Sequence, residues 1–173
     1  MSNGPALTTK RFLCRAPTDA DVDAFLPAFG DSAHMRYWSR GPFATREELA
    51  DYLLDEKAGR SWVAEPSEGG APVFRMFTSQ NGPQVNEIGY IIVPGNEGRG
   101  IARECLSALF THLFREEGVH RIFADVDPRN TRSNALLEKL GFTMEGHLRH
   151  TMKTHIGWCD SYIWGLLADE WRV

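Results

Sequence analysis

Apolar side chains recur at helical spacing in two stretches of the second half of the chain. Between Gly98 and Arg115 they stand at positions 102, 106, 109, 110, 113 and 114, which form one face of a helix with 3.6 residues per turn. A shorter stripe runs from Asn130 to Leu140, with Asn130 placed as an N-cap and Gly141 just past the last turn. The pattern therefore predicts two amphipathic helices here, the first of them ended by Gly118.

Two more helices are predicted nearer the start of the chain. One opens at residues 18–21 (Thr-Asp-Ala-Asp), which resemble a capping box, and carries apolar residues at positions 22, 25, 26 and 29. A similar signal at residues 45–48 opens the other, which is predicted to run to about Lys57 and to be closed by Gly59.

Short apolar or alternating runs predict the strands. The candidates are residues 11–15, 61–64, 73–78, 86–93, 119–126, a strand that starts at Phe142, and 160–167. The Pro- and Gly-rich segment 65–72 reads as a hairpin connection. This order of elements indicates an α/β sandwich with a central mixed sheet, and a length of 173 residues predicts one domain over residues 1–173.

Composition limits the partners that the chain is expected to have. A formal net charge of −4 argues against nucleic acid, whose binding needs a concentrated basic face. No apolar run has the length of a membrane span, and residues 1–10 lack the apolar core of a signal peptide. We therefore expect a cytoplasmic protein without a membrane partner.

Cysteine and histidine spacing predicts no metal site. Cys14, Cys105 and Cys159 are far apart in the sequence, so we interpret them as free thiols, with Cys105 as a small core residue. Three of the six histidines lie between positions 147 and 155 without H-x-x-x-H spacing, so they do not form a recognisable ligand set either.

The segment from Asn86 to Ala102 carries the chemistry, because a buried strand passes through a Gly-rich turn into a helix. Gly98 and Gly100 permit unusual backbone angles, and the first turn of the helix leaves about four N–H groups unpaired. Such a turn is an anion site, to which Arg99 and Arg103 add positive charge. A purely structural turn is the alternative interpretation.

The spacing of this turn disfavours two common phosphate sites. A P-loop needs Gly-Lys followed by Ser or Thr, and the dinucleotide fingerprint needs a third glycine where this chain has Arg103. A nicotinamide-binding module is therefore disfavoured.

Residues 97–102 and residues 125–142 form two blocks that, in this order, resemble the GCN5-related N-acetyltransferase (GNAT) superfamily. Residues 97–102 (E-G-R-G-I-A) look like its pyrophosphate loop, [QR]-x-x-G-x-[GA], although Glu97 replaces Gln or Arg. Residues 125–142 (D-V-D-P-R-N-T-R-S-N-A-L-L-E-K-L-G-F) are similar to its pantetheine-binding strand and helix, in the form typical of the RimJ/RimL-type ribosomal-protein alanine N-acetyltransferases. The match continues through residues 160–171 and only loosely includes residues 36–43.

The resemblance implies a fold, a donor and a set of binding residues. It implies a central, mostly antiparallel twisted sheet flanked by helices on both faces, acetyl-CoA as donor, an amine acceptor, and often a homodimer. Residues implied for acetyl-CoA are the backbone groups of Ile91, Ile92 and Val93, the turn residues Gly98, Arg99, Gly100, Ile101, Ala102 and Arg103, and Asn130 and Ser133 beside the thioester arm. The same residues also suit a buried strand, a turn and an N-cap.

Acetyl transfer needs a base, a site for the oxyanion and a thiolate leaving group. Glu87, at the start of the buried strand, is the candidate base, with a solvated strand-end charge as the alternative. Many relatives use a tyrosine as acid where this chain has Leu137, so Ser133 is the candidate replacement, with first-turn capping as its alternative. A strand N–H near Ile92 would hold the oxyanion. Tyr37, Trp38 and Trp158 are core residues or walls of the acceptor cleft.

Three functions remain open from the sequence. The first is transfer of acetyl from acetyl-CoA to the α-amine of a protein N-terminus or an amino-acid-like molecule, by direct attack in a ternary complex. The second is acetylation of a small antibiotic or metabolite amine. The third is a non-catalytic acyl-CoA-binding regulatory domain.

Overall fold

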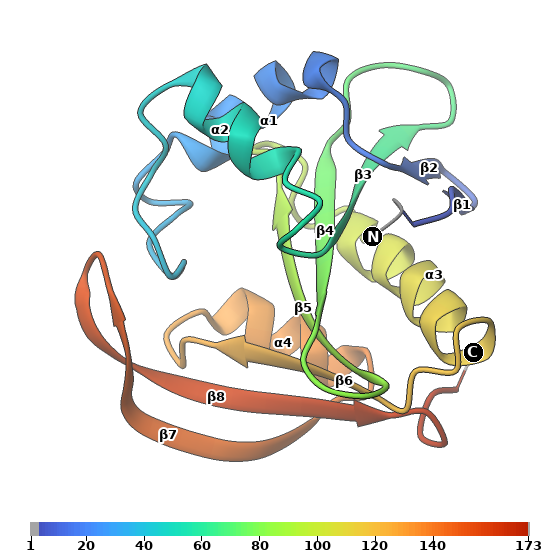
Figure 1. The fold of residues 1–173 in the computed structure, drawn as a ribbon, viewed down its shortest axis with the longest axis vertical. Helices are drawn as coiled ribbons and strands as arrows, with labels where there is room; N and C mark the ends of the chain where they lie inside the picture. Colours follow the sequence, from blue (N-terminus) through green and yellow to red (C-terminus); the bar gives the residue numbers. More distant parts are fainter. Residues whose placement is uncertain (1–3, 173) are drawn as a thin grey trace.

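The computed structural model describes residues 4–172, and their strands form one eight-stranded sheet (Figure 1). The sheet order is β1-β2-β3-β4-β5-β6-β8-β7. The strands are β1 Leu7–Thr8, β2 Phe12–Arg15, β3 Arg60–Pro66, β4 Phe74–Gln80, β5 Val85–Ile92, β6 Arg121–Val126, β7 Thr143–Thr154 and β8 Gly157–Leu167. Every neighbouring pair is antiparallel except β5 with β6, which confirms the predicted mixed, mostly antiparallel sheet.

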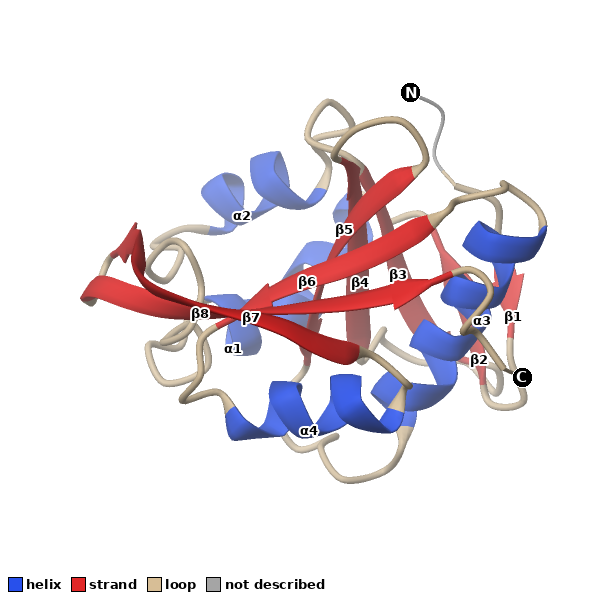
Figure 2. Cartoon of the chain, turned by 90° about the horizontal axis from the view of Figure 1, so that it is seen from below, coloured by secondary structure: helices blue, strands red, loops and turns tan. Residues whose placement is uncertain are grey.

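Helices cover both faces of this twisted sheet (Figure 2). On one face, α1 (Val22–Phe29) and α2 (Arg46–Leu53) bury their apolar sides in a cluster that includes Ile91 of β5. On the other, α3 (Ile101–Arg115) and α4 (Thr131–Lys139) pack over a larger cluster that includes the strand residues Met76 and Ile122. Two cores on opposite faces fix the sheet as the central layer. None of the helices described in residues 4–172 is long and apolar enough to cross a membrane.

The sheet opens between β5 and β6. Their parallel ladder comprises three pairs and ends where Glu87 lies opposite Phe123. Beyond that pair, β5 stays bonded to β4 as far as Ile92, while β6 stays bonded to β8 as far as Val126. The two strands therefore diverge, and the side of β5 that faced β6 has no strand partner after Glu87.

Three of the four predicted helix starts are confirmed by their caps. The Asp21 carboxylate accepts the Thr18 N–H at 2.7 Å, and a short 3₁₀ turn, Asp19–Asp21, leads into α1. The side chain of Thr45 accepts the N–H of residue 48 at the start of α2. Asn130 accepts the N–H of Ser133 at the start of α4. These polar groups satisfy N–H donors that the first turn leaves free.

Two predicted helix boundaries were wrong. The helix expected to reach Lys57 ends at Leu53, because the Asp55 carboxylate takes the Lys57 N–H at 2.9 Å in a turn that competes with the helix. The helix expected from Gly98 begins at Ile101, because Gly98 and Gly100 have φ values of 73° and 74°, which no right-handed helix accommodates.

The final hairpin is longer than the sequence pattern predicted. Strand β7 extends for 12 residues and β8 begins three residues before the predicted start at Asp160. Its pairing contains register shifts, and His150 has a positive φ of 46°. These irregularities break the alternation of apolar and polar side chains on which the strand prediction rested. Strand β1, only two residues long, was also missed.

Candidate active site

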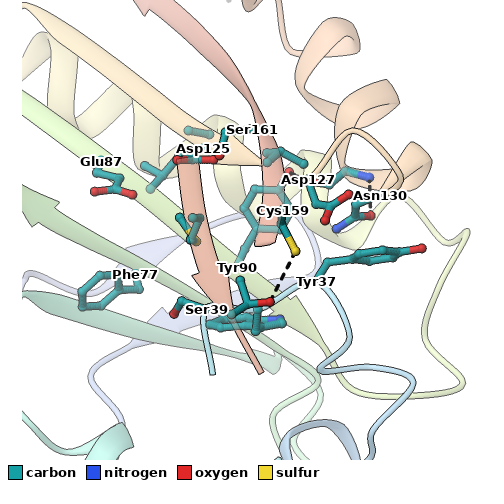
Figure 3. Close-up of a pocket in the computed structure, with 18 of the residues that line it drawn as sticks. Tyr37, Ser39, Phe77, Glu87, Tyr90, Asp125, Asp127, Asn130, Cys159 and Ser161 are labelled. Carbon is teal, nitrogen blue, oxygen red and sulfur yellow. Dashed lines mark hydrogen bonds between the residues drawn. The ribbon is translucent and has the colours of Figure 1, made fainter. Parts of the chain in front are cut away.

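A cavity of about 280 Å³ lies where β5 and β6 diverge (Figure 3). It is lined by the two diverging strands, the start of α4, the loop before α2 and the β7–β8 hairpin. Its polar and aromatic lining residues include Tyr37, Trp38, Glu87, Tyr90, Asp125, Asp127, Asn130, Ser133, Cys159 and Asp160. Three of the sequence-predicted site residues, Glu87, Asn130 and Ser133, are therefore brought to one cavity from two distant elements.

Glu87 lies at the floor of the opening, in the last pair of the parallel ladder. Asp125 is two residues beyond Glu87's partner on β6, so both carboxylates lie on the same face of adjacent strands. Burial raises the pKa of Glu87, and the charge of Asp125 raises it further. Burial also raises the pKa of Asp125. A carboxylate with a raised pKa is a better proton acceptor than an ordinary surface glutamate.

Ser133 reaches the cavity from the first turn of α4. Its Oγ lies 2.6 Å from the hydroxyl of Tyr90 on β5, so the two elements meet through a hydrogen bond across the opening of the sheet. Asn130 caps the helix by accepting the Ser133 N–H. The Ser133 hydroxyl is therefore not a helix cap. Leu137, where many relatives have a tyrosine, is fully buried.

The donor side of the site is the turn between β5 and α3. Gly95, Gly98 and Gly100 all have positive φ, and a Cβ on Gly98 would meet no atom within 4 Å. The first helical hydrogen bond runs from Glu104 N–H to the Gly100 carbonyl. The amides of residues 101, 102 and 103 therefore precede the helix ladder and are free to bind an anion. An open turn with free amides and positive dipole fits a pyrophosphate.

Charged side chains surround this turn. Arg99 and Arg103 are exposed beside it. Arg11, which sequence analysis did not identify, donates to the Arg99 carbonyl at 3.1 Å and pairs with Glu104 at 2.7 Å. The turn is therefore fixed to the N-terminal strands as well as to β5.

Glu97, the residue that departs from the expected motif, folds back onto the turn. Its Oε2 accepts the Gly95 N–H at 2.8 Å, and its Oε1 lies 3.4 Å from Nε2 of His34. Hydrogen bonds from the turn's backbone lower the pKa of Glu97. Its negative charge thus stands at the edge of the anion site.

The three predicted pantetheine contacts on β5 are not equivalent. The Val93 N–H donates to the Val73 carbonyl at 2.8 Å, and the Val93 carbonyl accepts the Asn96 N–H and side-chain amide. The Val93 N–H is therefore already used in the sheet, and pairing of Val93 with pantetheine stays a prediction. Alternation along an antiparallel ladder points Ile91 toward β4 as well, and points Ile92 toward the opening. Ile92 is the remaining backbone candidate.

The acceptor side of the cavity is acidic and aromatic. Tyr37 and Trp38 line it, whereas Trp158 is 59% exposed and does not. Asp127 is held by Arg129, with 2.6 Å between Oδ2 and Nη2, and that pairing lowers its pKa. Three more carboxylates, those of Glu87, Asp125 and Asp160, also line the cavity.

Histidine and cysteine side chains do not assemble a metal site in residues 4–172. Nε2 of His147 instead lies 2.8 Å from Oδ2 of Asp160. Cys105 is fully buried in the core beneath α3, as predicted.

A mixed α/β sheet that opens beside a glycine-rich helix start, with a carboxylate at the opening, is the arrangement that the resemblance to acetyl-transfer enzymes implied. The chain belongs to the family described as acetyltransferase (GNAT) domain, whose model matches residues 11–143.

Known proteins are similar to this chain over two thirds or more of its length. The [ribosomal protein uS5]-alanine N-acetyltransferase of Escherichia coli is 33% identical, covering 95% of this chain and 92% of that protein. The spermidine N(1)-acetyltransferase of the same species is 26% identical, covering 67% of this chain and 64% of that protein. The solved structure of a GNAT-family acetyltransferase from Bacillus anthracis superposes with a TM-score of 0.89 at 26% identity, covering 96% of this chain and all of that one.

Sequence analysis missed Tyr90, Asp125 and Arg11 as parts of the site. Tyr90 and Asp125 lie in strands whose apolar content marks them as core. Only the opening between β5 and β6 exposes them to a cavity, and that opening follows from pairing between distant segments. Asp125 is the first residue of the family block 125–142, which was the one available signal.

Proposed function

We propose that the protein transfers acetyl from acetyl-CoA to the α-amine of a protein N-terminus or an amino-acid-like molecule, by direct attack in a ternary complex. The observation that carries this proposal is the continuous arrangement of an anion-binding turn, an unpaired strand edge and a carboxylate-lined cavity. The 33% identity to an enzyme named for N-terminal alanine acetylation supports the choice of acceptor.

The chain's own groups fit the donor from its phosphates to its thioester. The amides of residues 101–103 and the side chains of Arg99 and Arg103 would hold the pyrophosphate. The free backbone of Ile92 would pair with the amide-bearing arm, and Asn130 and Ser133 would lie beside its end. When bound, acetyl-CoA supplies the activated acetyl thioester.

Glu87 is the proposed base. Its side chain lines the cavity, where an incoming ammonium group would give up a proton to it directly or through water. The deprotonated nitrogen then attacks the acetyl carbon, the C–N bond forms, and the C–S bond breaks. The remaining extra proton on nitrogen passes to the departing sulfur, directly or through water, and the proton on Glu87 is released to solvent, so the products are an amide, a thiol and one proton.

Two further groups serve the transition state. The Ile92 N–H, which has no strand partner on the opening side, would donate to the developing oxyanion, a contribution of the order of a hundredfold or more in rate. The Ser133 hydroxyl would donate to the departing thiolate. A thiolate with a pKa near 8.5 leaves readily, so this donor adds a modest factor.

A small polycationic amine is the second candidate acceptor. The cavity carries four carboxylates beside Tyr37 and Trp38, and both carboxylates and aromatic faces attract cations. One relative is named for spermidine acetylation. This acceptor keeps the same donor site and the same base, and changes only what fills the acidic half of the cavity.

A thiol-release assay tests the proposal. The purified protein is mixed with acetyl-CoA and, in separate reactions, with an alanine-initiated peptide lacking lysine, with spermidine, and without acceptor. Faster release with the peptide supports the N-terminal acceptor, and faster release with spermidine moves the assignment to the second candidate. Binding of acetyl-CoA with no acceptor-dependent release would identify a non-catalytic acyl-CoA-binding domain.

A further inference from the structure

Tyr90 and Ser133 form a hydroxyl pair that bridges the opening of the sheet. Tyr90 comes from β5, on the side that has lost its strand partner, and Ser133 comes from the first turn of α4. Their oxygens are 2.6 Å apart, a short distance for two neutral hydroxyls. Both residues line the cavity. Within residues 4–172 the Ser133 Oγ has no other hydrogen-bond partner.

The direction of this hydrogen bond follows from the chemistry of the two groups. A phenol is a stronger acid than an aliphatic alcohol, so the better donor is Tyr90 and the better acceptor is Ser133. The backbone N–H of Ser133 is already satisfied by Asn130, so the serine hydroxyl is not needed as a cap. With Tyr90 donating, the hydroxyl hydrogen of Ser133 remains free to donate into the cavity.

We propose that Tyr90 is a positioning residue that acts through Ser133, holding the serine hydroxyl so that it donates to the leaving thiolate. This inference rests on the proposed acetyl transfer. It adds Tyr90, which the sequence motifs did not identify, to the residues that serve that reaction. The ring of Tyr90 is itself fixed by packing against Phe74, with centroids 6.2 Å apart. The serine is therefore oriented from a rigid strand and not from a loop.

Tyr90 is not the proton donor itself. Burial raises the pKa of Tyr90 to about 12, although its hydrogen bond with Ser133 acts in the opposite direction. A thiol has a pKa near 8.5, so full proton transfer from this phenol to a thiolate is disfavoured by roughly three orders of magnitude. The phenol therefore stays protonated throughout, which is what a fixed hydrogen-bond donor requires.

A double-mutant cycle tests this role. Tyr90→Phe keeps the ring and its packing on Phe74 but removes the hydroxyl. We expect kcat to fall about 3- to 10-fold, the scale of one hydrogen bond, while the KM for acetyl-CoA stays unchanged. Ser133→Ala should lower kcat at least as much. Adding Tyr90→Phe to Ser133→Ala should then cost nothing further.

Several outcomes would overturn the inference. Unchanged kcat in Tyr90→Phe removes the role, and an undiminished effect of Tyr90→Phe in the Ser133→Ala background makes Tyr90 independent of the serine. Tyr162→Phe, which removes a phenol from β8 outside the cavity lining, is the matched control and should keep wild-type kcat. Thermal melts of all variants separate a loss of kcat from a loss of fold. A wild-type protein inactive with every amine would defeat the proposed function as well, whereas an active wild type with unaffected Tyr90→Phe defeats this inference alone.

Discussion

Glu87 and Asp125 lie on the same face of the only parallel strand pair among the described residues, at the point where that pair separates. The register sets this relationship, since Glu87 pairs with Phe123 and Asp125 follows two residues later. Figure 3 shows the two carboxylates on their neighbouring strands. Because like charges disfavour each other's ionisation, each carboxylate affects how readily the other holds a proton.

The pH dependence of turnover should therefore respond to Asp125. The Asp125 charge raises the pKa of Glu87, so Asp125→Asn should lower that pKa. Activity that requires ionised Glu87 would then persist to lower pH, and the acidic limb of kcat/KM should move to lower pH. Glu87→Gln should abolish the limb and lower turnover by roughly 10² to 10⁴. Asp51→Asn, an exposed change on α2, is the control. An acidic limb at the same pH in Asp125→Asn would contradict this coupling.

The raised pKa of Glu87 should also lower the free energy of unfolding of the protein when Glu87 is ionised. A carboxyl whose pKa is raised in the folded state favours the protonated form, so the folded state loses stability as pH rises through that pKa. Glu87→Gln should raise the free energy of unfolding by roughly 0.5 to 1 kcal/mol at pH 8, a value reduced for solvent screening at this half-buried site. At pH 4 the difference should vanish. Urea unfolding at both pH values measures this, and equal stability at pH 8 would count against it.

Gly100 should be essential for binding the donor. Its φ of 74° opens the turn onto the free amides of α3, and Gly100→Asp adds a Cβ and a negative charge there. Affinity for CoA should fall at least tenfold by calorimetry. Gly118→Asp is the matched control, because Gly118 has a similar φ of 67° at the opposite end of the same helix. If both variants kept wild-type affinity, the pyrophosphate would bind elsewhere.

Glu97 departs from the family motif, and replacing it with glutamine should increase the affinity for CoA. Glu97→Gln keeps an oxygen that accepts the Gly95 N–H but removes a charge at the edge of the anion site. The Kd for CoA should fall about 2- to 5-fold at low salt, and the gain should shrink as salt screens the charge. Glu116→Gln removes an exposed carboxylate at the far end of α3 and should leave the Kd unchanged. A weaker complex in Glu97→Gln would mean that the carboxylate is needed to shape the turn.

The sequence predicted those parts of the fold and site that depend on local patterns. The Gly98 turn, the Asn130 cap and the presence of the helix before Gly118 all follow from signals within one segment, although the start of that helix was placed at Gly98 and not at Ile101. The end of α2 was misplaced because a single Asp55 side chain competes with the helix. The hairpin of β7 and β8 was shortened because its irregular pairing removes the alternation that marks a strand.

The contacts across the sheet could not be predicted in this way. Tyr90 and Ser133 are 43 residues apart in the chain, and their meeting depends on where the β5–β6 ladder stops. The hydrogen bond that occupies the Val93 N–H likewise depends on the register of Val93 with Val73. Such facts come from pairing between segments, to which a single sequence gives no periodic signal.

An α-amine should react faster as the acceptor than a lysine side chain. An α-amino group has a pKa near 8 and lysine one near 10.4, so at neutral pH roughly a tenth of the α-amine is already neutral, against well under one percent of lysine. The four carboxylates that line the cavity stabilise either ammonium ion and oppose the deprotonation that attack requires, so they leave the difference between the two amines in place. In the same cavity a lysine therefore has a smaller neutral fraction than an α-amine.

The measurement compares a peptide with a free N-terminus and no lysine against the same peptide with a blocked N-terminus and one lysine, at pH 7 and pH 9. We expect the free N-terminus to react at least tenfold faster at pH 7, and the ratio to narrow at pH 9, where the α-amine is already mostly neutral and only lysine gains further. Charge in the cavity then serves to bind the cation while Glu87 removes one proton from it. Faster acetylation of the blocked peptide at pH 7 would show that the cavity deprotonates lysine, and a lack of reaction with both peptides, together with turnover of spermidine, would assign the acidic lining to a small polycation.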